Sequence, residues 1–97
     1  MPAASAAATA GWFVYMLECA GGRLYTGIAL DVAARYAQHC RGRGAAFTRI
    51  NPPLRIVAAM PMPDRSQALK AEAALKKRSR HDKLAWARQW PWHAPSA

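Results

Sequence analysis

Two side chains suited to phosphate chemistry stand four residues apart in this 97-residue sequence. Arg35 and His39 occupy positions i and i+4 of a segment with helical character, so they share one face of a helix. A guanidinium can bind two phosphate oxygens at once, and an imidazole can move a proton near neutral pH. Spacing alone favours a solvated helix face, so the pair becomes a candidate site only together with further groups.

Glu72 is the most informative acid of the chain. It lies three residues after Leu69 and three before Leu75, which places it on or beside the apolar stripe of its helix. A carboxylate at the edge of a core must be paired, protonated or bound to a metal ion. The alternative is an ion pair with Lys76, four residues later, which would be worth only a few tenths of a kcal/mol. The apolar neighbours favour a role in a site.

Two tyrosines stand on the two arms of a predicted hairpin. Tyr15 and Tyr25 are ten residues apart. If the connecting loop has an odd number of residues, or if a bulge supplies the extra one, both rings project from the same face of the sheet. With the other parity they point apart. Taken alone, two such tyrosines are more often packing residues with a solvated hydroxyl group.

The charge balance of the chain indicates a polyanionic partner. Fourteen lysines and arginines oppose five acids, and the formal net charge is +9. Such an excess attracts nucleic acid first, although charge alone does not separate an enzyme from a passive binder. The alternative, a solvated basic face, is weakened by the shortage of balancing acids. The residues that we expect to contact nucleic acid are Arg41, Arg43, Arg49, Lys76, Lys77, Arg78 and Arg80.

Strands and helices alternate along the chain in an order that can bring these groups together. Turn residues 20–22 join the first two strands, and Pro61 and Pro63 are expected to end the third. The order ββαβαα predicts an α+β fold, a short sheet with helices packed against it. The predicted strands are 12–17, 23–28 and 54–60, and the predicted helices are 32–40, about 65–79 and about 81–90.

The chain is expected to form one domain over residues 12–90. Residues 1–11 are rich in alanine and predict a disordered leader, and residues 91–97 predict an irregular tail. No apolar run approaches the roughly 20 residues that span a bilayer, so we expect no membrane partner. The leader lacks basic residues and the two cysteines form no CxxC motif. Both features favour a cytoplasmic protein with free thiols.

The order and spacing of these motifs resemble the GIY-YIG endonuclease superfamily, and most closely its small stand-alone bacterial members. The likeness covers about residues 12–85. Phe13-Val14-Tyr15 stands in place of Gly-Ile-Tyr, and the only asparagine, Asn51, lies in a loop rather than on a helix beyond the glutamate. The matching segments are Val14-Tyr15, Tyr25-Thr26-Gly27, Arg35, His39, Gly44-Ala45, Thr48-Arg49, Asp64-Arg65-Ser66 and Ala71-Glu72.

The resemblance implies a three-stranded antiparallel sheet flanked by helices, and hydrolysis of DNA phosphodiesters with a single Mg²⁺ or Mn²⁺. By matching positions, Glu72 would hold the metal and Arg35 would stabilise charge on the scissile phosphate. One of the two tyrosines would act as general base, with Tyr15 favoured over Tyr25, although the sequence does not decide between them. Tyr25 and His39 would help to lower the pKa of that tyrosine or receive its proton.

The sequence leaves open the choice of DNA substrate and two alternative functions. A catalytic domain without an attached sequence-specific DNA-binding domain should select DNA by its shape, for example branches, flaps or single strands. Such structures arise as intermediates of repair and recombination, which are the processes that we expect. The main alternative is a nucleic-acid-binding module of the same fold that does not cut. A third is an adaptor that uses the tryptophan-rich C-terminal segment, whose Trp86, Trp90 and Trp92 could instead stack on unpaired bases.

Overall fold

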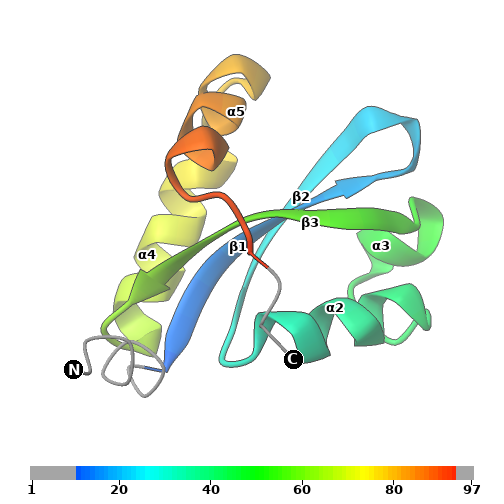
Figure 1. Ribbon diagram of the computed structural model, residues 1–97, viewed down its shortest axis with the longest axis horizontal. Helices are drawn as coiled ribbons and strands as arrows, with labels where there is room; N and C mark the ends of the chain where they lie inside the picture. The colour runs from blue at the N-terminus through cyan, green and yellow to red at the C-terminus, as the bar shows by residue number, and fades with distance from the viewer. Residues whose placement is uncertain (1–10, 94–97) are drawn as a thin grey trace.

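Three strands form one antiparallel sheet in this computed structural model, which describes residues 11–93 (Figure 1). The central strand β1 (Trp12–Cys19) pairs with β2 (Arg23–Ala29) on one side and with β3 (Pro53–Met62) on the other. The loop between β1 and β2 is a single 3₁₀ turn, η1 (Ala20–Gly22), at the place where the sequence predicts a turn. The α+β class and the three-stranded antiparallel sheet are therefore confirmed.

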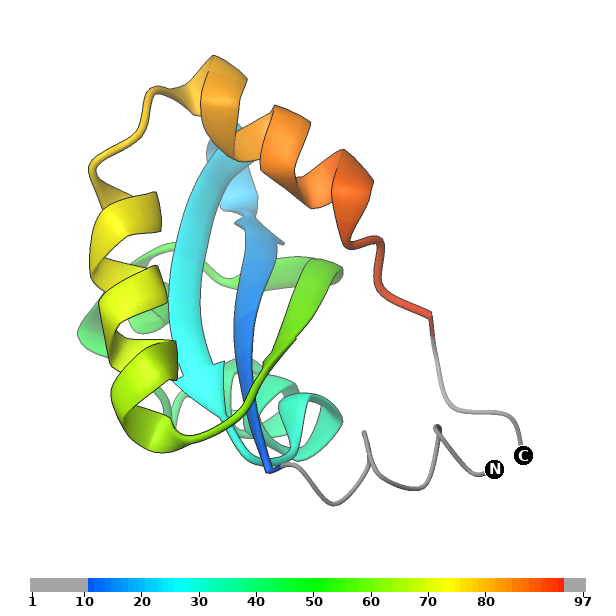
Figure 2. The same cartoon turned by 90° about the vertical axis from the view of Figure 1, so that its left-hand side faces the viewer.

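Helices cover both faces of this sheet (Figures 1 and 2). On one side lie α2 (Val32–Cys40) and the short α3 (Ala46–Ile50), and on the other lie α4 (Arg65–Lys76) and α5 (Arg80–Gln89). The three longer helices begin at residues whose side-chain oxygens accept a backbone N–H, as N-caps do. These caps are Asp31, Asp64 and Ser79.

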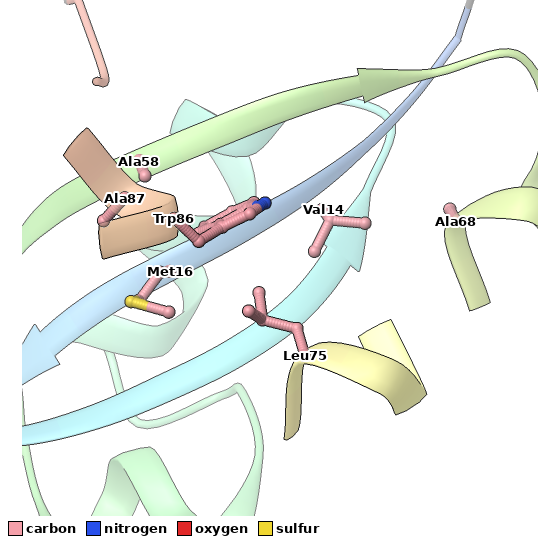
Figure 3. Packing of buried hydrophobic residues seen from close by; sticks show 7 residues of the cluster. All are labelled: Val14, Met16, Ala58, Ala68, Leu75, Trp86 and Ala87. Carbon is pink, nitrogen blue, oxygen red and sulfur yellow. The ribbon is translucent and has the colours of Figure 1, made fainter. Parts of the chain in front are cut away.

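The alternation of side chains along β1 divides the core into two clusters. Val14 and Met16 face α4 and α5, where they pack with Leu75 and Trp86. Figure 3 shows these side chains converging from β1, α4 and α5. Tyr15, Leu17 and Cys19 face the opposite side and pack with Val32 of α2. The second cluster thus contains one of the candidate catalytic residues.

Two predicted boundaries are wrong, and the edge position of β3 explains the second. The segment after Gly44, expected to be loop, contains the helix α3. The third strand was expected to stop at Pro61, yet β3 continues through it to Met62. β3 is an edge strand of the order β2-β1-β3, and an edge strand tolerates a residue that lacks an N–H.

The start of the tail has no helix or strand of its own but is bound to the sheet. Trp92 N–H donates to Val57 O at 3.1 Å, and Ala59 N–H donates to Trp90 O at 3.0 Å. Pro91 and Ala58 form an isolated antiparallel bridge between these two bonds. The segment after α5 therefore covers the outer edge of β3. The predicted leader, apart from Gly11, and residues 94–97 of the tail lie outside the described residues.

None of the helices in residues 11–93 is both long enough and apolar enough to span a bilayer.

Candidate active site

The register of the hairpin places both predicted tyrosines on one face of the sheet. Tyr15 lies opposite Gly27, and Leu17 lies opposite Tyr25. Opposed residues of an antiparallel pair point to the same side, as do residues two apart on one strand. The loop that joins the strands has three residues, the odd number that this arrangement needs. The two phenol rings lie with their centroids 6.2 Å apart.

Gly27 gives the Tyr15 ring the space that it occupies. A Cβ atom added at residue 27 would lie 2.7 Å from Tyr15 Oη and 2.8 Å from its Cζ. Real side chains do not approach so closely, so any larger residue would displace the phenol. Glycine at this position is thus a steric requirement of the site.

His39 joins the sheet to two helices through a chain of buried polar groups. Its Nε2 atom lies 2.8 Å from Tyr15 Oη, and its Nδ1 atom lies 2.8 Å from Thr48 Oγ1. The Thr48 hydroxyl in turn donates to the carbonyl oxygen of Ala45 at 2.8 Å. Tyr15, His39 and Thr48 are each only 1% exposed. This chain runs from β1 through α2 to the first turn of α3.

Tyr25 and Arg35 complete the surroundings of His39. The Tyr25 ring lies edge-on to the imidazole at 5.1 Å between centroids. Arg35 is on the same helix as His39, and its Nη1 atom donates to Gln38 Oε1 at 2.9 Å. The half-buried guanidinium is close enough to influence both Tyr15 and His39 electrostatically.

Burial keeps both members of the Tyr15–His39 pair uncharged. Desolvation raises the pKa of Tyr15 far above its usual value, and interaction with Tyr25 raises it further. The positive charge of Arg35 opposes that shift, and the negative charge of Glu72 adds to it. Desolvation lowers the pKa of His39, and the positive charge of Arg35 lowers it further by a smaller amount. At neutral pH the free protein therefore holds a phenol against a neutral imidazole.

Glu72 lies on α4, on the other side of the sheet, and is connected to this group through its electrostatic effect on Tyr15. It follows the buried Ala68 by four residues on α4 and precedes the buried Leu75 by three, so it lies on the packed stripe of the helix. Its side chain is 17% exposed, and Oε2 lies 3.2 Å from Lys76 Nζ. The ion pair that the sequence offered as an alternative is present. Leu69, also expected on the stripe, is exposed instead.

The donor set fits a hydrated divalent cation rather than a protein-enclosed one. Within residues 11–93, no three histidine, cysteine or acidic side chains are grouped as a metal site. Magnesium commonly keeps several water ligands and takes one or two carboxylates together with substrate phosphate oxygens. The partly exposed Glu72 carboxylate meets that requirement, since only its Oε2 atom is engaged by Lys76.

The predicted nucleic-acid-binding residues divide between the two sides of the sheet. Arg41, Arg43 and Arg49 are exposed around the α2–α3 connection. The other four, Lys76, Lys77, Arg78 and Arg80, are exposed around the junction of α4 and α5. Two of these four have local partners, because Lys76 pairs with Glu72 and Arg80 donates to Gly22 O at 2.6 Å. The sequence did not reveal this division.

Thr48 and Gly44 are site residues to which sequence reasoning assigned no function. A Cβ atom at residue 44 would collide with the His39 ring, so this glycine lies flat against the imidazole. The available signal was the segment Gly44-Ala45 with Thr48-Arg49, part of the family resemblance. Asn51 has a local role, since its Nδ2 donates to Phe47 O at 3.1 Å at the end of α3.

Comparisons with known proteins identify the family of this chain. Residues 11–85 match the family model of the GIY-YIG catalytic domain. A UPF0213 protein of Cupriavidus pinatubonensis is 51% identical over 75 residues, which cover 77% of this chain and 83% of the relative. One from Cupriavidus necator is 42% identical over 89 residues, 92% of this chain and 97% of the relative. The chain belongs to the GIY-YIG family.

A solved structure supports the GIY-YIG assignment at the level of the fold. The solution NMR structure of the UPF0213 protein from Bacillus halodurans superimposes with a TM-score of 0.52 at 37% sequence identity. The match covers 81% of this chain and 84% of that one. The first motif of this GIY-YIG domain ends with Tyr15 within β1, and the second begins with Tyr25 within the neighbouring strand β2. The GIY-YIG family to which the chain belongs is of a nuclease type.

Proposed function

We propose that this protein is a metal-dependent endonuclease that hydrolyses DNA phosphodiester bonds. The observation that supports this most directly is the buried contact between Tyr15 Oη and His39 Nε2, at 2.8 Å, beside Arg35. A phenol held against a neutral imidazole has an acceptor for its proton, which a tyrosine needs before it can act as a base. A simple binding module has no need of such a pair.

In this proposal Tyr15 is the general base. Its proton moves to His39 Nε2, and the phenolate then takes a proton from the water that attacks phosphorus. A free phenol, with a pKa of about 10, is almost entirely protonated at neutral pH, so the acceptor is essential. Because Tyr15 is only 1% exposed, binding of the strand must open a path to its hydroxyl.

Arg35 and Glu72 have the charges that the remaining steps require. The Arg35 guanidinium would bind the non-bridging oxygens of the scissile phosphate and stabilise the negative charge that develops there. Glu72 would hold a single divalent cation, Mg²⁺ or Mn²⁺, which supplies Lewis-acid stabilisation of the phosphate when bound. Lys76 would then exchange its contact with Glu72 for the DNA backbone.

The surface next to the tyrosines favours unpaired or branched DNA. Phe47 of α3 lies 5.8 Å from Tyr25 between ring centroids and is 37% exposed, and Ile50 is 78% exposed. Arg43 precedes α3 and Arg49 lies within it, both are exposed, and no acid occurs in the sequence between Asp31 and Asp64. Exposed aromatic side chains among cations stack on unpaired bases and bind their phosphates. This apolar patch on α3 joins Trp90, which is also 37% exposed, as a candidate stacking surface, whereas Trp86 is buried and Trp92 packs beside β3.

The proposal is tested by nicking of supercoiled plasmid in Mg²⁺, Mn²⁺ or EDTA. We expect the wild type to cut with metal only, and Glu72→Gln and Arg35→Ala to lose at least about 100-fold in rate, the lower range for removing such a group. Glu18→Gln is the matched control, since Glu18 pairs with Arg55 and takes no part in the site.

Failure to cut any substrate would instead support the non-catalytic binding module. A panel of duplex, flap and junction substrates then tests the preference for shape, and equal rates on all three would contradict it. Tyr15→Phe and Tyr25→Phe compare the two tyrosines directly. The larger loss should come from Tyr15→Phe.

A further inference from the structure

The direction of the hydrogen bonds around His39 follows from the single proton of Thr48. A threonine hydroxyl has one proton to donate and can accept with its oxygen. That proton is engaged by the carbonyl oxygen of Ala45, at 2.8 Å. Towards His39 Nδ1, also at 2.8 Å, the Thr48 oxygen can therefore only accept. The Nδ1 atom must carry the proton.

The other ring nitrogen is then left as an acceptor. A neutral imidazole carries one proton, so Nε2 is bare once Nδ1 is protonated. Its partner is the Tyr15 hydroxyl at 2.8 Å, which must donate to it. The chain has one polarity from end to end: the Tyr15 hydroxyl to His39 Nε2, His39 Nδ1–H to the Thr48 hydroxyl, and the Thr48 hydroxyl to Ala45 O.

We propose that Thr48 is a positioning residue that holds His39 in its Nδ1–H tautomer, so that Nε2 can accept the Tyr15 proton during DNA cleavage. The catalytic part of this inference rests on the proposed nuclease function. The Tyr15 O–H bond breaks as an Nε2–H bond forms, and the resulting imidazolium keeps its Nδ1–H bond to Thr48. In the opposite tautomer Nε2 carries the proton, so it would point an N–H at the phenol and could not accept the Tyr15 proton.

The backbone around α3 places Thr48 where this function needs it. Ala45 is the residue before the first turn of α3, and its carbonyl group is three residues before Thr48. Gly44, which has no side chain, lies against the His39 ring, where any Cβ atom would collide with Nδ1. This close approach brings the first turn of α3 within hydrogen-bond distance of the imidazole.

The tautomer can be measured in the free protein, without any activity, from the ¹⁵N chemical shifts of the His39 ring. We expect Nδ1 to have the shift of a protonated nitrogen and Nε2 that of an unprotonated one at neutral pH. Thr48→Val keeps the shape but removes the acceptor, which would leave a buried Nδ1–H without a partner. The proton should move to Nε2. Thr48→Ser restores the hydroxyl and should restore the wild-type shifts.

The cleavage rate provides the second readout. Thr48→Val should lower the single-turnover rate by about 100-fold or more, as for the loss of a proton acceptor, with unchanged DNA affinity. Thr48→Ser should recover most of that rate. The control is Thr26→Val, another buried Thr→Val replacement, at a residue of β2 opposite Met16 on the other face of the sheet. It should leave both the shifts and the rate unchanged.

Two results would overturn the inference. An Nε2–H tautomer in the wild type, or wild-type shifts in Thr48→Val, would show that Thr48 does not set the tautomer. A changed tautomer with an unchanged cleavage rate would remove its role in catalysis. If the wild type cuts no DNA, the nuclease proposal and the catalytic role of Thr48 both fail, and the shifts still decide whether Thr48 sets the tautomer.

Discussion

The chemistry that we propose depends on a few buried side chains whose protonation is set by their surroundings. Tyr15 and His39 are both held neutral, because burial raises the pKa of the phenol and lowers that of the imidazole. Transfer of the Tyr15 proton to His39 would create both charged forms together, as an ion pair. The groups that surround His39 are Arg35 on its own helix, Tyr15 and Tyr25 on the sheet, and Thr48 on α3, with Glu72 acting on Tyr15 from α4.

The lowered pKa of His39 predicts a loss of stability in weak acid. An unfolded histidine titrates near pH 6.5, so below that pH the unfolded chain binds a proton that the folded protein resists. The contribution is complete above about pH 6.5 and is lost as the pH falls through the lower pKa of the folded state. Thermal unfolding between about pH 5 and 8 should show a steeper decline for wild type than for His39→Gln. Parallel curves would contradict this prediction.

At the scale of the elements, the site depends on close approaches that only glycine permits. Gly27 on β2 makes room for the Tyr15 phenol, and Gly44 lets the α2–α3 connection lie against His39. Both approaches lie between elements, so they determine how β1, β2, α2 and α3 meet. Replacing either glycine should displace the reacting groups more than it disturbs the overall fold.

Gly27→Ala should therefore reduce cleavage more than stability. The added Cβ would lie 2.7 Å from Tyr15 Oη, so the hydroxyl must leave its place beside His39 Nε2. Overpacking of this kind costs typically about 1–3 kcal/mol of stability. Thermal unfolding and the plasmid assay on the same preparation separate the two effects. A variant that cuts at the wild-type rate would show that this placement of the phenol is not needed.

The segment after α5 protects the edge of the sheet. Trp90, Pro91 and Trp92 lie along β3 through two hydrogen bonds and a bridge. Removing residues 90–97 should expose the edge strand, lower the unfolding temperature and promote association through β3. Size-exclusion chromatography and thermal unfolding measure these effects. If the shortened chain is as stable and monodisperse as the full one, this segment is free for a partner, as the adaptor hypothesis requires.

Across the whole molecule, the basic residues predicted to contact nucleic acid form two groups on opposite sides of the sheet. One basic group surrounds the α2–α3 connection, next to the tyrosines, and the other surrounds the junction of α4 and α5. A DNA strand that reaches Tyr15 from the side of α3 passes the first group. We therefore expect the arginines near α3 to carry more of the binding.

The salt dependence of DNA binding can compare the two groups. Each lost phosphate contact should lower the slope of log affinity against log salt by about 0.9 for duplex DNA. The double variant that carries Arg41→Gln and Arg43→Gln should lower this slope by about 1.8, the value for two lost contacts. Lys77→Gln with Arg78→Gln, which removes the same charge from the other side, should lower it less. Fluorescence anisotropy over a series of salt concentrations provides the slopes, and the reverse order would place the strand on α4 and α5.

Local sequence determined the elements and the chemical groups that they carry. The caps Asp31 and Asp64 predicted where two helices begin, and residues 20–22 predicted the turn between the first two strands. These features depend on residues close together in the chain, so propensity and spacing suffice to find them. The order ββαβαα and the family resemblance follow from the same information.

Only the tertiary structure decided how these groups act on one another. Tyr15 and His39 are 24 residues apart, and Thr48 lies on a helix that the sequence did not predict. The edge position that lets β3 continue through Pro61, and the division of the basic residues between two sides, likewise depend on how the elements pack. Hydrogen bonds between distant residues need positions accurate to a fraction of an ångström, and the packing of whole elements sets those positions, whereas spacing along the chain does not.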